Sequence, residues 1–151
     1  MKRLLSLFIA LIMTVSLCAC GSGEKVTDFY NKVTESQDLL DAVADAIYSN
    51  WYDAIYEDEF GEDINTAIYM AQLDHTDDLE RIEELDAEIS DLFKEIKDTE
   101  QGALIKDIMS AYSDYYEFVV NVSGSFNSYS ADKETLKKEL ASLLKDLSYE
   151  I

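Results

Sequence analysis

The stretch EKVTDFYNKVTESQDLLDAVADAIYSNWYDAIY, residues 24–56, decides the fold because its apolar residues recur with the period of a helix. One stripe repeats every seven residues and consists of Val26, Val33, Leu40, Ile47 and Ala54; a second contains Tyr30, Ala44 and Trp51, with Phe29 and Val43 beside it. Stripes at this spacing form one wide apolar face of an α-helix. The segment therefore predicts a helix of about 50 Å that buries one side along its whole length.

Three further segments carry helical periods. The second predicted helix runs from about Asp63 to Lys97. Its two heptad positions are held by Ile68, His75, Ile82, Ile89 and Ile96 and by Ile64, Ala71, Asp78, Leu85 and Leu92. The third is capped by Asp98 or Thr99 and reaches about Tyr129, with its stripe formed by Ile105, Ile108, Tyr112, Tyr115, Val119, Val122 and Phe126. A shorter fourth helix follows a cap at Ser130 or Asp132 and carries Leu136, Leu140, Leu143, Leu144 and Leu147.

Composition agrees with a helical fold. Proline is absent and glycine is rare, which suits long helices and argues against a β-rich chain. Short connections place successive helices antiparallel. We therefore expect an all-α fold over residues 24–151, an elongated antiparallel up-down bundle of three long helices plus one shorter C-terminal helix. Because the fourth helix is short, one end of the bundle should be three-stranded and partly open, and we expect the binding surface there.

The first twenty residues have the organisation of an export signal. Lys2 and Arg3 precede an apolar run that is too short to span a membrane comfortably. The run ends in Leu17-Cys18-Ala19-Cys20, followed by Gly21-Ser22-Gly23, and this string resembles the lipobox of bacterial prolipoproteins. The resemblance implies that residues 1–19 are removed and that Cys20 carries a diacylglyceryl group with palmitate-like chains. Residues 20–23 would then be the lipidated cysteine and a short tether, and the membrane itself would be a partner at its outer face.

Charge and cysteine content exclude several classes of function. The formal net charge of the chain is −20, and two of its few cations leave with the leader. Such a surface repels nucleic acid phosphates, so we expect no nucleic acid partner and favour cationic ones, such as metal ions or basic peptides. Cys18 leaves with the leader and Cys20 is alkylated, which excludes cysteine catalysis and zinc–thiolate sites in the mature domain.

Aromatic residues supply the candidate binding site. The chain contains 10 Tyr, many of them grouped. The candidates are Trp51, Tyr52 and Tyr56 late in the first helix and Tyr112, Tyr115 and Tyr116 in the third. Tyrosine and tryptophan are the usual anchors of a groove for a peptide, glycan or partner helix. The alternative is that they fill a wide core with their hydroxyls at its rim.

An acidic turn supplies a candidate cation site. Its carboxylates are Asp53, Glu57, Asp58, Glu59, Glu62 and Asp63, and Ca²⁺ prefers several such oxygen ligands. An EF-hand is excluded because counting back from Gly61 places Tyr56 and Phe60 at ligand positions. The alternative is a solvated, self-repelling turn without any cofactor.

His75 is the only histidine. It lies on the seam of the second predicted helix with Asp78 one turn later. A metal ligand or general base is one interpretation, and a polar core layer in which His75 and Asp78 satisfy each other is the other, which we favour.

These patterns favour a non-enzymatic, membrane-anchored interaction module at the cell envelope, for a protein, peptide or cell-wall partner. In this broad sense the chain resembles the small helical lipoproteins of Gram-positive bacteria. An acidic cation-binding or sensing lipoprotein is the alternative, and an envelope hydrolase is a third.

Overall fold

The computed structural model describes the backbone of residues 2–57 and 59–151, and the side chains of residues 21–151 other than Asp58 and Glu62. The elements are α1 (Lys2–Tyr56), the short 3₁₀ helix η1 (Glu59–Glu62), α2 (Ile64–Asp74), α3 (Thr76–Ile96), α4 (Gly102–Val120) and α5 (Phe126–Leu147). The all-helical fold predicted from the sequence is confirmed, since the described residues contain no strand. No helix among the described residues is both long and apolar enough to span a membrane.

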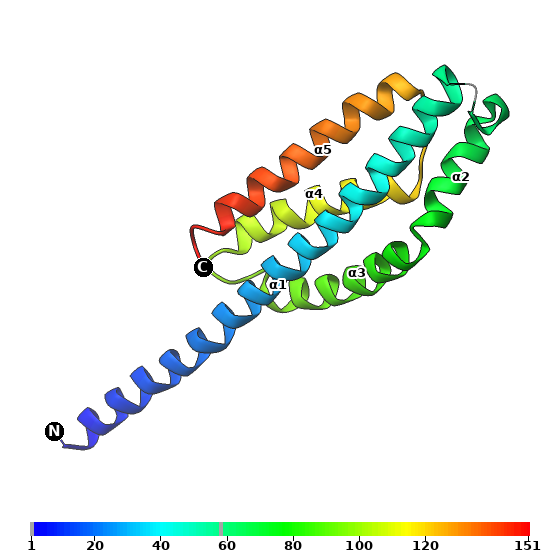
Figure 1. Ribbon diagram of the computed structural model, residues 1–151. Coiled ribbons are helices and arrows are strands. Elements are labelled where there is room, and N and C mark those ends of the chain that lie inside the picture. The colour runs from blue at the N-terminus through cyan, green and yellow to red at the C-terminus, as the bar shows by residue number, and fades with distance from the viewer. Residues whose placement is uncertain (1, 58) are drawn as a thin grey trace.

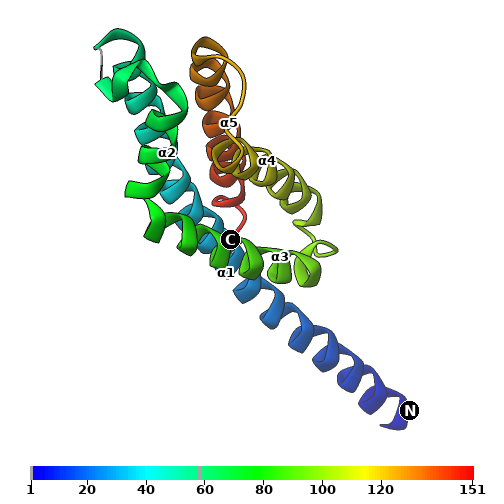
Figure 2. The same ribbon diagram turned by 90° about the vertical axis from the view of Figure 1, so that its right-hand side faces the viewer.

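Helix α1 is the spine of the molecule. It runs the full length of the bundle, and its first turns project beyond the other helices (Figures 1 and 2). The chain returns along α2 and α3, runs back along α4 and returns again along α5 (Figure 1). All four of these helices pack against α1. We call the end where α1 stops and α5 begins the distal end; it comprises the last turn of α1, helix α2 and the first turn of α5.

The apolar stripe that predicts α1 is the centre of the core. Val26, Val33, Leu40, Ile47 and Ala54 are each at most 2 % exposed. Gly21 to Gly23, expected to form a short tether, instead continue helix α1, and the Gly23 carbonyl accepts a hydrogen bond from Thr27 Oγ1 at 3.0 Å. The bundle is therefore joined to position 20 by helix rather than by a loop.

The prediction of one continuous second helix is wrong, because this segment forms two helices, α2 and α3. The backbone leaves helical geometry at His75, with φ −111° and ψ 28°, and α3 starts at the next residue. At the bend, both core-facing heptad positions are occupied by polar residues, His75 and Asp78. Apolar packing on α1 therefore does not favour a continuous helix at this point. Asp77 and Asp78 in the first turn of α3 favour a helix start because they complement the positive end of the helix dipole. The start of α2 agrees with expectation: Asp63 caps it, accepting from the amides of Asn65 and Thr66.

The boundary between the third and fourth predicted helices is also wrong. Helix α4 ends at Val120, well before Tyr129, and α5 begins at Phe126. Gly124 adopts φ 91°, which favours glycine, and Ser125 caps α5 in a capping box with Ser128. Helix α5 therefore has 22 residues against 19 in α4, so the expected short fourth helix is not short.

The corner between α3 and α4 also differs from expectation. The predicted cap Thr99 does not start α4; its hydroxyl donates to the carbonyl of Ile96 at 2.7 Å and closes α3. Helix α4 begins at Gly102, which is buried against the preceding backbone. A Cβ atom at Gly102 would lie 2.4 Å from the carbonyl oxygen of Lys97. The close approach of two backbone segments therefore requires glycine at this position.

Gly102→Ala should destabilise the protein by about 1–3 kcal/mol, because the Lys97 carbonyl is main chain and can move only with the corner. Thermal unfolding followed by circular dichroism measures the change. Gly23→Ala is the matched control, since nothing lies within 4 Å of its Cβ position. A Gly102→Ala variant as stable as the wild type would show that the corner is not tightly constrained.

Candidate functional site

The six aromatic binding candidates fall into different environments. Tyr112 and Tyr115 are 0 % exposed and belong to the core, so their assignment to a binding surface is wrong. They lie on the same side of α4 as Ile105 and Ile108, which face α1 in the hydrophobic core. Tyr116 is half-buried, while Tyr52 and Tyr56 are 39 % and 57 % exposed.

The buried tyrosine hydroxyls are satisfied by polar groups of α1. Tyr112 shares a hydrogen bond of 3.2 Å with the buried Ser36, and Tyr115 donates to the Asp41 carboxylate at 2.6 Å. Burial, followed by the neighbouring carboxylate of Asp41, raises the pKa of Tyr115 far above its usual value. Both residues therefore remain neutral and lock α4 onto α1.

An aromatic cluster occupies the distal end, and Phe126 is its hub. The ring of Phe126 stacks on Tyr48 at 5.0 Å between centroids and lies 6.2 Å from both Tyr52 and Tyr56. Trp51 contacts Phe126 edge-on at 6.0 Å. The structure thus brings Trp51, Tyr52 and Tyr56 together as the sequence predicts. It adds Phe126, which sequence periodicity assigned to the third helix; the signal that places it at the start of α5 is the Gly124-Ser125 pair before it.

Helix α5 is fixed on α1 by polar contacts just below this cluster. Lys133 is only 8 % exposed, yet its ammonium group pairs with Asp45 and lies 4.6 Å from the centroid of the Tyr48 ring. Tyr129 donates to the carbonyl of Ala44 at 3.3 Å. These contacts set the register in which Phe126 meets the tyrosines of α1.

Trp51 is the buried member of the cluster, 4 % exposed, and the only tryptophan of the chain. Its indole Nε1 has no hydrogen-bond partner among the described residues. A buried donor without an acceptor costs about 1–3 kcal/mol. The hydrogen bonding of buried groups is therefore less complete at the distal end than between α1 and α4, where Tyr112 and Tyr115 each have a hydrogen-bond partner.

A groove opens at the distal end on another side of the bundle. Helix α2 packs against α1 and, within the described residues, does not contact α4 or α5. The bend at His75 thus leaves a groove of about 330 Å³ between α2–α3 and the end of α4. We call it the distal groove; its lining residues are Gln72, Thr76, Leu79, Glu80, Glu83, Tyr116 and Val120. The sequence predicted a partly open end, but the opening arises from the departure of α2 and not from a short fourth helix.

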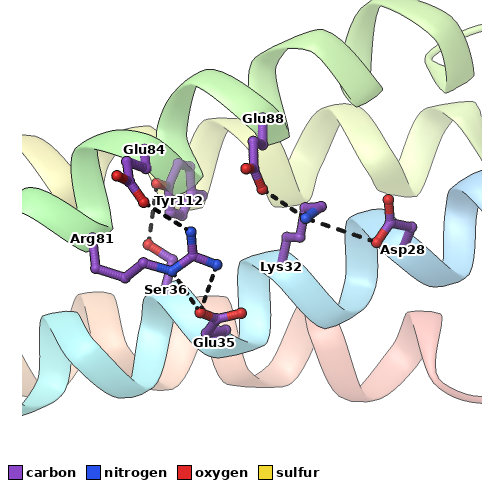
Figure 3. Close-up of polar contacts among 8 residues, drawn as sticks. All are labelled: Asp28, Lys32, Glu35, Ser36, Arg81, Glu84, Glu88 and Tyr112. Atoms are coloured by element: carbon purple, nitrogen blue, oxygen red, sulfur yellow. Dashed lines mark hydrogen bonds and ion pairs between the residues drawn. The ribbon is translucent and has the colours of Figure 1, made fainter.

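Charge is distributed unevenly between the two sides of α3. On the side facing α1, acidic residues meet cations (Figure 3). Lys32 pairs with Glu88 at 2.6 Å, and Arg81 bridges Glu35 at 2.9 Å and Glu84 at 3.1 Å. Lys25 pairs with Glu95 nearer the start of α1. Among the described side chains of α1 and α3, the cations Lys25, Lys32 and Arg81 thus lie on this seam, while Lys94 pairs with Asp91 on its own helix.

On the side of α3 that faces α4, the described acidic residues have no cationic partners. Asp86 makes no hydrogen bond or ion pair with any described residue. Burial, and then repulsion from Glu117 on α4, raises the pKa of its carboxyl group. The pKa of Tyr116 is also raised, first by burial and then by Asp86, Glu83 and Glu117. The seam beside the distal groove therefore carries uncompensated negative charge.

The acidic turn does not assemble a metal site in the part of the chain that the structure describes. No group of three or more acidic, histidine or cysteine side chains there is arranged to hold a metal ion. Among the six predicted ligands, Asp58 and the side chain of Glu62 lie outside the described residues. The Asp63 carboxylate caps α2 and accepts from Thr66 Oγ1 at 3.0 Å, and these hydrogen bonds lower its pKa. Asp53, Glu57 and Glu59 form no such group with other described side chains.

His75 lies at the bend and not inside a continuous helix. Its Nδ1 is 2.6 Å from Asp78 Oδ2, so the predicted contact between the two residues is present. The histidine side chain is 27 % exposed, and the pair sits at the joint between α2 and α3. It therefore stabilises the start of α3 rather than forming an enclosed polar layer.

No family model, no curated protein and no solved structure matches this chain. The function must therefore be inferred from the residues and their geometry.

Asp86→Asn should raise the melting temperature at pH 7. The raised pKa means that the folded state binds the proton more tightly than the unfolded state, so stability falls as pH rises through the titration of this carboxyl. Asparagine mimics the protonated form, and its advantage over the wild type should shrink as the pH falls towards 4. Thermal melts from pH 4 to 8 measure this. Asp114→Asn, at an exposed acid on the neighbouring helix α4, is the control for net charge. Equal effects of both substitutions would contradict this explanation.

Proposed function

We propose that this protein is a lipid-anchored interaction module of the bacterial cell envelope. Its anchor would be a diacylglyceryl group on Cys20, whose side chain lies outside the described residues. The support for the anchor is the lipobox-like string Leu17-Cys18-Ala19-Cys20 after a basic start and a short apolar run. Two acyl chains on one cysteine provide a stable attachment to a membrane, whereas one is marginal.

The observation that carries the interaction role is the exposed aromatic surface at the distal end. Tyr52 and Tyr56 pack against each other and against the half-buried Phe126, yet both remain exposed to solvent. Phe126 is in turn held by Trp51 and Tyr48. Rigid aromatic residues that lose little freedom on binding are typical hot spots of protein interfaces. Ile55 adds apolar surface next to them on α1 and is 39 % exposed.

The length of α1 would hold this surface away from the proposed anchor. The helix is continuous from Cys20 to Tyr56, which corresponds to about 50 Å at 1.5 Å per residue. The distal end would thus face outward from the membrane and meet a protein or wall component rather than lipid. The acidic surface agrees with this orientation because anionic headgroups repel it.

Cys20→Ser should abolish both lipidation and removal of the leader when the full chain is expressed in a bacterium. Intact mass spectrometry of the membrane fraction would detect the wild type as a chain that starts at a lipid-modified Cys20. Cys18→Ser is the matched control and should be processed normally, because that residue leaves with the leader. A wild-type chain with an unmodified Cys20, or with an intact leader, would overturn the proposed anchor.

A photo-crosslinking amino acid at position 56 should capture a defined envelope partner in living cells. The same amino acid at position 149, which is even more exposed but lies at the other end of the bundle, should not capture it. Tyr52→Ala in the position-56 strain should reduce the yield, because Tyr52 belongs to the same exposed aromatic surface, one helical turn from position 56. Identical products from both positions would show that the distal aromatic residues are not a specific interface.

A further inference from the structure

The distal groove has the features of a binding site that is separate from the aromatic cluster. Its floor is formed by three half-buried apolar side chains, Leu79 on α3 and Tyr116 and Val120 on α4. Its walls do not include Tyr52, Tyr56 or Phe126. The groove exists because α2 bends away at His75 while α4 continues to Val120. It is thus a product of the backbone path and not of a single side-chain rotamer.

The rim of the distal groove is acidic. Glu80 and Glu83 are exposed, and within the described part of the chain neither makes a hydrogen bond or an ion pair. The lining contains no lysine or arginine. Asp86 and Glu117 extend the negative charge along the same seam. Arg81, the nearest cation in sequence, points to Glu35 and Glu84 on the opposite side of α3 (Figure 3).

The apolar floor and the acidic rim indicate which kind of ligand would fit the groove. We propose that the distal groove binds a short cationic, amphipathic segment of a partner protein. Apolar side chains of that segment would lie on Leu79, Tyr116 and Val120, while its lysines or arginines would pair with Glu80 and Glu83. This inference rests on the proposed function as an outward-facing interaction module and names the chemistry of its partner.

Other occupants fit less well. A second copy of this chain would bring another strongly acidic surface to an acidic rim, and like charges across an interface are unfavourable. A neutral glycan would leave the carboxylates without counter-charges. A cationic segment satisfies both the apolar floor and the rim, and it would associate faster at low salt because of electrostatic steering.

The test uses the full lipidated chain in micelles of a neutral detergent, titrated calorimetrically with a short synthetic peptide. The peptide consists of lysine and leucine in helical period, and the same micelles without protein give the blank. We expect the double variant Glu80→Gln/Glu83→Gln to bind the peptide about tenfold more weakly than the wild type. The matched control Glu100→Gln/Glu139→Gln removes the same charge from exposed positions outside the groove and should change the affinity less than about twofold.

Two further arms separate the groove from general charge attraction. A peptide with glutamine in place of lysine should lose binding. Tyr116→Ala should weaken binding of the lysine peptide at a temperature where the melting curve of this variant shows that it is still folded. The inference would be overturned if both glutamate pairs weakened binding equally, or if the glutamine peptide bound as well as the lysine peptide. It would also be overturned if the lysine peptide did not bind, or if concentration-dependent dimerisation of the protein blocked peptide binding. If the wild-type protein did not bind the lysine peptide but was lipidated normally and crosslinked normally at position 56, only the groove proposal would be overturned and the proposed function would stand.

Discussion

The burial of one face of α1 is the constraint on which the rest of the structure depends. Every other helix packs against this face, and its residues are almost completely removed from solvent. Fully burying one large aliphatic or aromatic side chain contributes about 1.5–3 kcal/mol, so a stripe repeated over five heptads dominates the stability of the bundle. The position of each remaining helix then follows from where its own apolar side chains meet α1.

Polar contacts decide the orientation of the other helices around that spine. Tyr115 and Lys137 both reach Asp41, which ties α4 and α5 to one point of α1. The ion pairs Lys32–Glu88 and Arg81–Glu35 join α3 to α1. Because the chain has few cations, pairing them along α1 leaves the outer seam of α3 and α4 without counter-charges. The scarcity of cations therefore leaves this part of the exterior acidic, which is the basis for the cationic partner proposed above.

Much of the fold could be predicted from the sequence, but the breaks between helices could not. The stripe of α1 is unambiguous because it persists over five heptads with no polar residue in it. The break at His75 keeps the heptad phase on both sides, so counting periods cannot detect it. Phe126 fits the period of the preceding helix as well as its true position at the start of α5. Only local signals, the acidic first turn after His75 and the Gly124-Ser125 pair, reveal these boundaries.

The candidate site shows the same division. Grouping of tyrosines and tryptophan along α1 correctly predicts an aromatic end, because neighbouring turns of one helix lie close in space. It fails for Tyr112 and Tyr115, because a tyrosine can be buried once its hydroxyl forms a hydrogen bond with a group on another helix. The partners here, Ser36 and Asp41, are far away in sequence. The distal groove could not be foreseen, because it depends on the bend between α2 and α3.

We propose that α1 is a rigid spine between a lipid anchor and an outward-facing distal end. Resonance energy transfer tests it most directly, with a donor on a Tyr56→Cys variant and acceptor headgroups in vesicles that carry the lipidated protein. No other free thiol would compete for the label in the mature lipidated chain. The account predicts a donor–membrane separation of about 50 Å, unchanged by vesicle composition. A donor found close to the headgroups, as for a bundle lying on the membrane, would contradict it.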